Sequence, residues 1–266
     1  MAASIAALHV YPLKSGAALS PDSAEVQAHG LAGDRRWLIV DEQARFVTGR
    51  QLPRIVLLRA TPRASGVRLE FPGATALELE FPEPGQARLA VRVWNDVVEA
   101  QVAERAGAWL ARCFERPLRL VYMDEHALRP VRPDYGSPGD VVSFADAFPL
   151  LLIGSGSLDA LNARLARAVP MARFRPNVVV RGADAHAEDG WRRLRVGAVT
   201  FDVVKPCTRC VFTTVDPETG RFDPDGEPLA TLKEYRRTPA GVTFGQNLIP
   251  RGTGTIRVGD PVEQLL

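Results

Sequence analysis

Short β-prone segments run through most of this chain, and between about Arg54 and Gln101 glycine and proline break them at intervals of about ten residues. Such spacing permits hairpins and meanders, whereas parallel strands need longer crossover connections. The segments of β type are residues 5–12, 24–28, 37–40, 55–61, 67–71, 77–81, 89–94, 148–153, 178–180, 198–204, 210–215 and 256–262. Helical spacing of apolar residues occurs at 103–115, after Ser155 or Ser157, and at 229–237, while 123–140 is a long loop. The pattern predicts a β-rich α+β protein or barrel and disfavours a Rossmann fold.

Composition narrows the class of protein. A chain of 266 residues favours two domains, on a prior of about 150 residues each. The formal net charge of +2 gives no general attraction to nucleic acid or to an anionic membrane. No segment approaches the ~20 apolar residues that span a bilayer, and the first residues lack the charged region of a signal peptide. Three cysteines argue against a disulfide framework. We expect a cytoplasmic protein that binds neither nucleic acid nor a membrane.

The segment 205–216, KPCTRCVFTTVD, carries the clearest chemical signal. Lys205 and Arg209 lie beside Cys207 and favour the thiolate, which is the form that binds metals or acts as a nucleophile. Cys207 is therefore the residue that needs a functional explanation. The remaining cysteine outside this segment, Cys113, falls on the apolar face of a predicted helix and indicates core packing.

Two other uses of a Cys-x-x-Cys pair are a zinc half-site and a thioredoxin-like redox pair. A zinc site needs four ligands, and no second pair of Cys or His has matching spacing. The four histidines are scattered, at His9, His29, His126 and His186. A thioredoxin-like motif opens a helix, whereas the segment after Cys210 is of β type. The sequence therefore favours metal ligation by Cys207 and a structural role for Cys210.

Several further motifs occur along the chain: YPLKS at 11–15, GDRRW at 33–37, FRPN at 174–177, DPETG at 216–220 and FGQN at 244–247. Together with the cysteine segment, and in this order, they resemble the MOSC superfamily. The resemblance is strongest to the molybdenum enzymes of the amidoxime-reducing component type and their bacterial relatives. It implies a MOSC-type β-barrel with a smaller mixed α/β N-terminal (MOSC_N) subdomain.

The resemblance also implies a molybdenum cofactor, Mo-molybdopterin. The first cysteine of the family motif ligates the metal, which assigns that role to Cys207. An arginine grips a phosphate with two charge-assisted bonds, although a single Lys or Arg is more often a solvated surface residue. The residues that match the family's phosphate and pterin contacts, its further hydrogen-bond donors and its cofactor wall are Lys14, Ser15, Arg35, Arg175, Asn177, Thr208, Arg209, Gln246 and Asn247.

The single cofactor site that the resemblance implies also predicts the domain organisation. If residues near 14, 35, 175 and 207 surround one ligand, the first strands belong to the same barrel as the C-terminal half. We therefore expect residues 1–36 and 124–266 to form the cofactor-binding barrel, with 37–123 inserted as the subdomain.

Asp146 matches a position near the metal where the family places a candidate proton relay. The alternative is a turn or capping aspartate, which is common before an apolar run. Because Phe144 and Phe148 flank it, we expect the carboxyl to have the raised proton affinity that acid catalysis needs.

The implied reaction is a two-electron reduction of a small N-hydroxylated compound, such as an amidoxime, a hydroxylamine or an N-hydroxylated base analogue, to the amine or amidine and water. No cluster-binding cysteines follow the barrel, so electrons are expected from a separate ferredoxin, flavodoxin or cytochrome b type protein with its reductase. The alternatives are a cofactor carrier without turnover and a sulfur transferase with a persulfide on Cys207.

Overall fold

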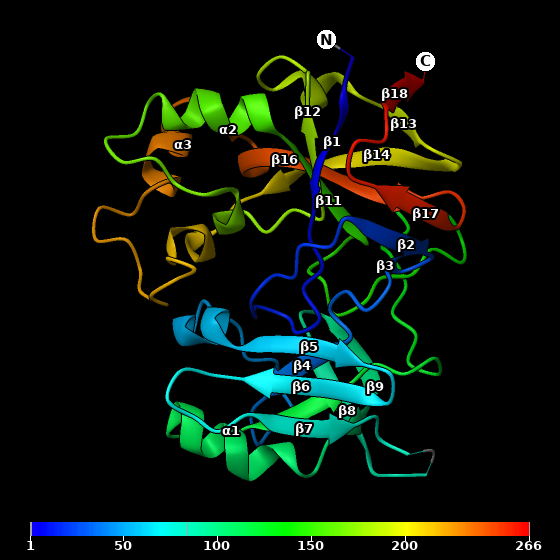
Figure 1. Cartoon of the computed structure of the whole chain (residues 1–266), viewed down its shortest axis with the longest axis vertical. Helices are drawn as coiled ribbons and strands as arrows, with labels where there is room; N and C mark the ends of the chain where they lie inside the picture. The colour runs from blue at the N-terminus through cyan, green and yellow to red at the C-terminus, as the bar shows by residue number, and fades with distance from the viewer. Residues whose placement is uncertain (1, 84, 266) are drawn as a thin grey trace.

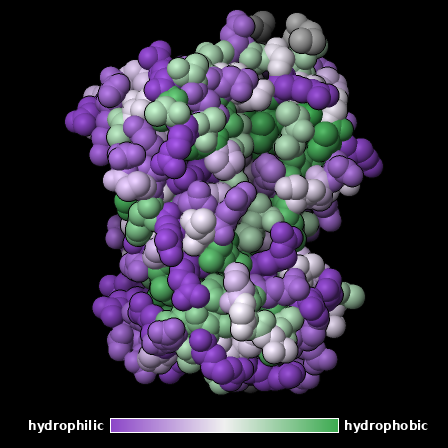
Figure 2. Space-filling view, turned by 60° about the vertical axis from the view of Figure 1, so that its left-hand side comes forward, coloured by the Kyte–Doolittle hydropathy of each residue, from purple (hydrophilic) through white to green (hydrophobic). Residues whose placement is uncertain are grey.

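The computed structural model describes residues 2–83 and 85–265. Strands make up 38% of the chain and helices 15%, which confirms the β-rich prediction. Two parts are stacked along the long axis, one built on a large curled sheet and the other on two smaller sheets and a helix (Figure 1). A waist separates the two parts on the surface, and hydrophilic side chains cover most of the visible face (Figure 2).

The large sheet is a nearly closed barrel. Its strands follow the order β1 (Ser4–Leu8), β12 (Val178–Arg181), β11 (Leu150–Gly154), β16 (Gly241–Pro250), β14 (Val199–Thr208), β13 (Arg193–Val196) and β18 (Val262–Leu265), with β15 (Arg237–Thr238) beside β16. The amide of Ile5 donates to the carbonyl of Asp260 at 2.9 Å, and that of Val262 donates to Ala3 at 2.9 Å. These bonds bring the two edge strands together, and a buried apolar cluster that includes Phe201 packs against the sheet.

Three further elements complete this part. The strands β17 (Gly254–Arg257), β2 (Ser23–Gln27) and β3 (Gly30–Leu31) form a small sheet that joins the two ends of the sequence. The helices α2 (Ser155–Asn162) and α3 (Leu229–Tyr235) lie together on one side of the barrel (Figure 1). Leu161, Leu232 and Phe244 pack between these helices and β16, which fixes the position of the strand.

The second part contains two antiparallel sheets, ordered β4 (Trp37–Val40), β10 (Arg119–Tyr122), β9 (Asp96–Val102), β8 (Arg88–Val93), and β5 (Arg59–Arg63), β6 (Gly66–Glu70), β7 (Leu77–Glu80). The helix α1 (Ala106–Phe114) buries Trp109, Leu110 and Cys113 in a core shared by these sheets. The predicted helix and the packing role of Cys113 are thus confirmed. No named element lies between β10 and β11 in the described residues, as expected for the long loop.

Three strand predictions were wrong. Residues 211–214 form the 3₁₀ helix η4 (Val211–Thr214), because the hydroxyls of Thr213 and Thr214 bond back to the carbonyls of Cys210 and Val211 at 2.9 and 2.8 Å. The segment 55–61 starts within the 3₁₀ helix η1 (Pro53–Leu57), where proline occupies the first position. The single strand expected at 256–262 is two strands, since a turn with Gly259 at φ +94° interrupts it.

Candidate functional site

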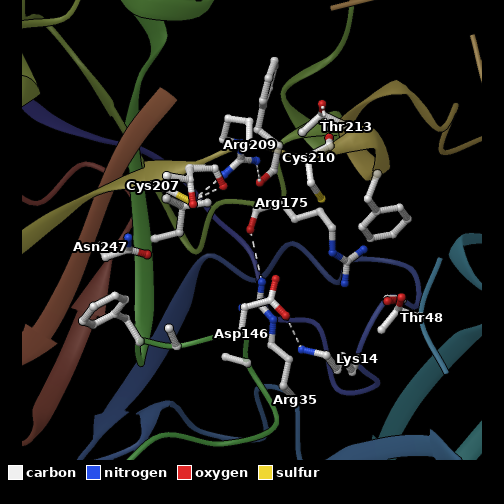
Figure 3. A pocket seen from close by; sticks show the side chains of 18 of the residues that line it. Lys14, Arg35, Thr48, Asp146, Arg175, Cys207, Arg209, Cys210, Thr213 and Asn247 are labelled. Carbon is white, nitrogen blue, oxygen red and sulfur yellow. Dashed lines mark hydrogen bonds and ion pairs between the residues drawn. The ribbon is translucent and has the colours of Figure 1, made fainter. Parts of the chain in front are cut away.

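The segments that were expected to share one ligand meet at a cleft between the two parts. The cleft holds about 840 Å³, counting space open to solvent, which suits a small-molecule site. Figure 3 shows Cys207, Cys210 and Arg209 on one side and Lys14, Arg35 and Asp146 on the opposite side. Six cationic side chains line it, and among the described lining residues Asp146 is the one carboxylate. The cationic residues are Lys14, Arg35, Arg50, Arg173, Arg175 and Arg209.

Lys14 follows β1 in a loop, and its amide donates to the carbonyl of Trp37, the first residue of β4, at 2.9 Å. Its ammonium donates to the carbonyl of Phe144 at 2.7 Å and to the carboxylate of Asp146 at 2.6 Å. Burial lowers the pKa of Lys14 to about 8, although Asp146 opposes that shift. Ser15, the next residue, is buried and also lines the cleft.

The expected raised proton affinity of Asp146 is wrong. Its side chain is 67% exposed, but the walls of the cleft surround it. Desolvation favours the neutral acid, yet the charge and hydrogen bond of Lys14 outweigh it and hold the pKa of Asp146 well below its usual range. The carboxyl is therefore ionised at neutral pH.

Arg35 is fixed by a network of buried groups. It has φ +48°, and its guanidinium donates to Asp34 at 2.5 Å, to the side-chain oxygen of Asn177 at 2.9 Å and to the carbonyl of Arg175 at 3.2 Å. Asp34 is fully buried and also accepts from the Tyr11 amide at 2.8 Å and from Asn177 at 3.1 Å. Burial raises the pKa of Asp34, and Arg35 counteracts that rise. The second residue of the GDRRW motif thus positions the third.

Arg175 lies between two aromatic rings. Its guanidinium is 4.1 Å from the ring centre of Tyr11 and 5.6 Å from that of Phe212, and one of its nitrogens donates to the carbonyl of Gly16 at 2.6 Å. Burial, with the nearby charge of Arg35, lowers the pKa of Arg175 to about 10. Because Arg35 also lies over Tyr11, at 4.4 Å, one buried ring carries two of the cleft's cations.

The two cysteines of the motif differ in their surroundings. The sulfur of Cys207 accepts from Arg209 Nη1 at 2.8 Å, and its side chain packs against the apolar cluster around Phe174 and Phe244. Cys210 is exposed, precedes η4 and also lines the cleft. Among the described residues, no hydrogen bond involves the Cys210 sulfur. Both thiols are free, so no disulfide joins them.

The two predicted site residues on β16 point in opposite directions. Adjacent residues of a strand point to opposite faces, so Asn247 lines the cleft while Gln246 points away and donates to Asp189 at 2.7 Å. Thr208, Arg209 and Asn177 line the cleft as expected.

Sequence reasoning missed several lining residues: Thr48, Arg50, Arg173, Phe212 and Thr213. Arg173 lies two residues before the predicted Arg175, with Phe174 between them. That spacing was the sequence signal by which Arg173 could be found. Thr48 and Arg50 belong to the second part, where no motif marked them.

The residues present fit an anionic cofactor better than a metal ion bound by side chains alone. Within residues 2–83 and 85–265, no group of three or more His, Cys, Asp or Glu side chains is placed to hold a metal. By contrast, Arg175 Nη2 and Arg209 Nε are buried donors without a partner among the described residues. Buried donors are normally satisfied, so a bound anion is the natural acceptor.

Two family models match this chain. The family model of the MOSC N-terminal beta barrel domain matches residues 2–117, and that of the MOSC domain matches residues 139–263. The cleft draws Lys14, Arg35 and Arg50 from the first match and Asp146 and Cys207 from the second. Fold and cleft together define a protein of the MOSC class.

Two relatives of more than 35% identity, which match 97% of this chain, narrow the class. Mitochondrial amidoxime-reducing component 1 of Danio rerio is 41% identical, covering 97% of this chain and 83% of the relative, and that of Homo sapiens is 37% identical over 97% and 82%. The YuaD protein from Bacillus subtilis is a solved structure that covers 98% of this chain and 94% of its own, at 12% identity and TM-score 0.41. The chain belongs to the MOSC-domain family of the amidoxime-reducing components. No helix in the described part of the chain has the length and apolarity to cross a membrane.

Proposed function

We propose that the cleft binds a molybdenum cofactor and that the protein reduces N-hydroxylated compounds, such as amidoximes, hydroxylamines and N-hydroxylated base analogues, to amines or amidines. The convergence of six buried or half-buried cations and two thiols on one cleft carries this proposal. Membership of the amidoxime-reducing component family supports it. A carrier would bind the cofactor through the same cations and thiol and differs from a reductase in its lack of turnover, whereas a sulfur transferase needs the thiol but not the six cations of the cleft.

Lys14, Arg35 and Arg175 would hold the anionic tail of the cofactor. Their positions are set by Asp146, Asp34 and Tyr11, so the cleft is organised before an anion arrives. Further hydrogen bonds and the wall of the site would come from Ser15, Asn177, Thr208, Arg209 and Asn247, all of which line the cleft.

One cysteine would be the protein's ligand to the metal. The sequence assigns this role to Cys207, but the Cys207 sulfur already accepts from Arg209 and packs against apolar side chains. Cys210 is exposed to the cleft, and a ligand needs an open sulfur. The contacts therefore make Cys210 the better-placed ligand, with Cys207 and Arg209 shaping the wall behind it.

The reaction consumes two electrons and two protons, because R–NH–OH + 2e⁻ + 2H⁺ gives R–NH₂ + H₂O. The bound cofactor supplies the electrons. Asp146 is ionised, so the proton of the Lys14–Asp146 pair resides on Lys14 at neutral pH. The pair is bonded at 2.6 Å and reaches the cleft, which suits it to pass a proton toward the substrate.

The electrons would come from a separate ferredoxin, flavodoxin or cytochrome b type protein with its reductase, in the cytoplasm. For the organisation of the chain we propose a barrel of residues 1–36 and 124–266 with 37–123 inserted. In support, the strands between Trp37 and Tyr122 pair only with one another in the described sheets, apart from one isolated bridge between Trp37 and Leu13.

The decisive experiment is anaerobic reduction of benzamidoxime by molybdenum-loaded protein with reduced viologen as donor. We expect benzamidine to form, and Cys210→Ser to abolish its formation with the fold retained. Cys113→Ala, in the core of the second part, is the matched thiol control and keeps activity. A loaded protein that converts no N-hydroxylated substrate favours the carrier, and labile sulfur on Cys207 without stoichiometric molybdenum favours the transferase.

A further inference from the structure

The turn between β8 and β9 holds a large aromatic residue in a strained conformation. Val93 pairs with Asp96, so Trp94 and Asn95 form the two-residue connection. Trp94 has φ +57°, a left-handed value that hairpin turns normally give to glycine or asparagine. Strain of this kind persists where the surroundings hold it, and it gathers at functional sites.

The same side chain is unusually exposed. Trp94 is 44% exposed, whereas Trp37, Trp109 and Trp191 are 3%, 4% and 7% exposed. Glycine or asparagine at this position would relieve both the strain and the apolar exposure. Folding alone therefore does not explain the tryptophan.

Contacts connect the indole to the cleft. The guanidinium of Arg50 lies 4.3 Å from the ring centre of Trp94, and the ring of Phe46 lies 5.2 Å from it. Arg50 lines the cleft. The Trp94 side chain is also close enough to Asp146, which lines the cleft too, to help lower the pKa of that carboxyl. Trp94 thus stands at the rim, on the side of the second part.

We propose that Trp94, held by Arg50 and Phe46, is a specificity-determining residue that favours N-hydroxylated substrates with a planar, delocalised group over aliphatic ones. The inference rests on the proposed function and adds its substrate class. A flat π system gains by lying against the free area of the indole, whereas an aliphatic chain has no such face. The guanidinium of Arg50, which lines the cleft, lies against the indole and limits its motion.

The test compares benzamidoxime with acetamidoxime on the loaded enzyme and its Trp94→Asn variant. Asparagine accepts a left-handed φ, so we expect an unchanged or higher melting temperature. The KM for benzamidoxime should rise by about three- to tenfold with kcat little changed, while that for acetamidoxime stays constant. Val97→Ala, on the same hairpin and 59% exposed, is the matched control and should change neither value.

A second readout needs no turnover. Because the other tryptophans are buried, benzamidoxime should quench the emission of wild-type protein and leave that of Trp94→Asn unchanged. An unchanged benzamidoxime KM in the variant, or an equal rise for both substrates, would overturn the inference. If wild-type enzyme reduces neither compound, the proposed function fails, while the quenching result still decides whether Trp94 contacts planar ligands.

Discussion

Lys14 is a buried residue whose positive charge contributes to the proposed anion site of the cleft. The side chain is 6% exposed and bonds to Asp146, yet burial brings its pKa to about 8. In the unfolded chain the Lys14 ammonium has its ordinary pKa of 10.5. Between about pH 8 and pH 10.5, folding therefore releases this proton. Stability from this group therefore rises with pH through that window, since the unfolded state binds more protons there.

Anion binding should follow the opposite trend. As pH rises through 8, Lys14 loses its charge, and we expect the affinity of cofactor-free protein for sulfate to fall by about fivefold, or about 1 kcal/mol. Titration calorimetry between pH 7 and 9 measures this directly. Lys14→Arg keeps its charge and should give a flat profile. A wild-type profile as flat as that of Lys14→Arg would show that Lys14 does not contribute to the anion site.

At the scale of elements, β16 is the strand that carries Asn247 into the cleft, and Gly245 allows it to pack closely on β11. Gly245 has φ +80°, and a Cβ there would lie 2.7 Å from the carbonyl oxygen of Leu152. Gly73 has φ +78° with open space around it. Gly73→Ala should cost about 1 kcal/mol from backbone strain alone, and Gly245→Ala about 2 kcal/mol more from crowding. Equal losses in urea unfolding would contradict the close packing.

The sequence patterns located most strands because alternating or apolar segments between glycine and proline are local signals. They missed β3, β9, β10, β13, β15 and β16. The FGQN motif of β16 carries a polar pair, and the hairpin of β9 begins at a strained tryptophan rather than at a typical turn residue. They also misassigned 211–214, because the threonine hydroxyls bond to nearby carbonyls instead of leaving the backbone to a sheet.

At the scale of the whole molecule, Arg129 links the two parts. It is 3% exposed, donates to the carbonyls of Ser143 at 3.1 Å and Asp146 at 2.8 Å, and pairs with Asp96 of β9 at 2.7 Å. Arg129→Gln should cost about 3 kcal/mol, because buried carbonyls lose their donor. Asp96→Asn removes a partner that is 44% exposed and should cost under about 1 kcal/mol. If denaturant unfolding gives both variants the same loss, the link through Arg129 is not structural.

The site was predictable where one segment carried a motif. Lys14, Arg35, Arg175 and Cys207 were named in advance, and the structure brings them to one cleft. Arg50 was not found, because it reaches the cleft through the packing of the second part against the first, and neither was Trp94, which contacts Arg50. The sign of the Asp146 shift also depended on a distant residue, Lys14, that sequence spacing does not place beside it.

The central claim is that a sulfur of this chain binds molybdenum in the cationic cleft. X-ray absorption at the molybdenum edge counts the sulfur atoms around the metal and needs no substrate. We expect one fewer sulfur per molybdenum in Cys210→Ser than in wild type, with Cys113→Ala unchanged. The same sulfur count in wild type, Cys207→Ser and Cys210→Ser would contradict it.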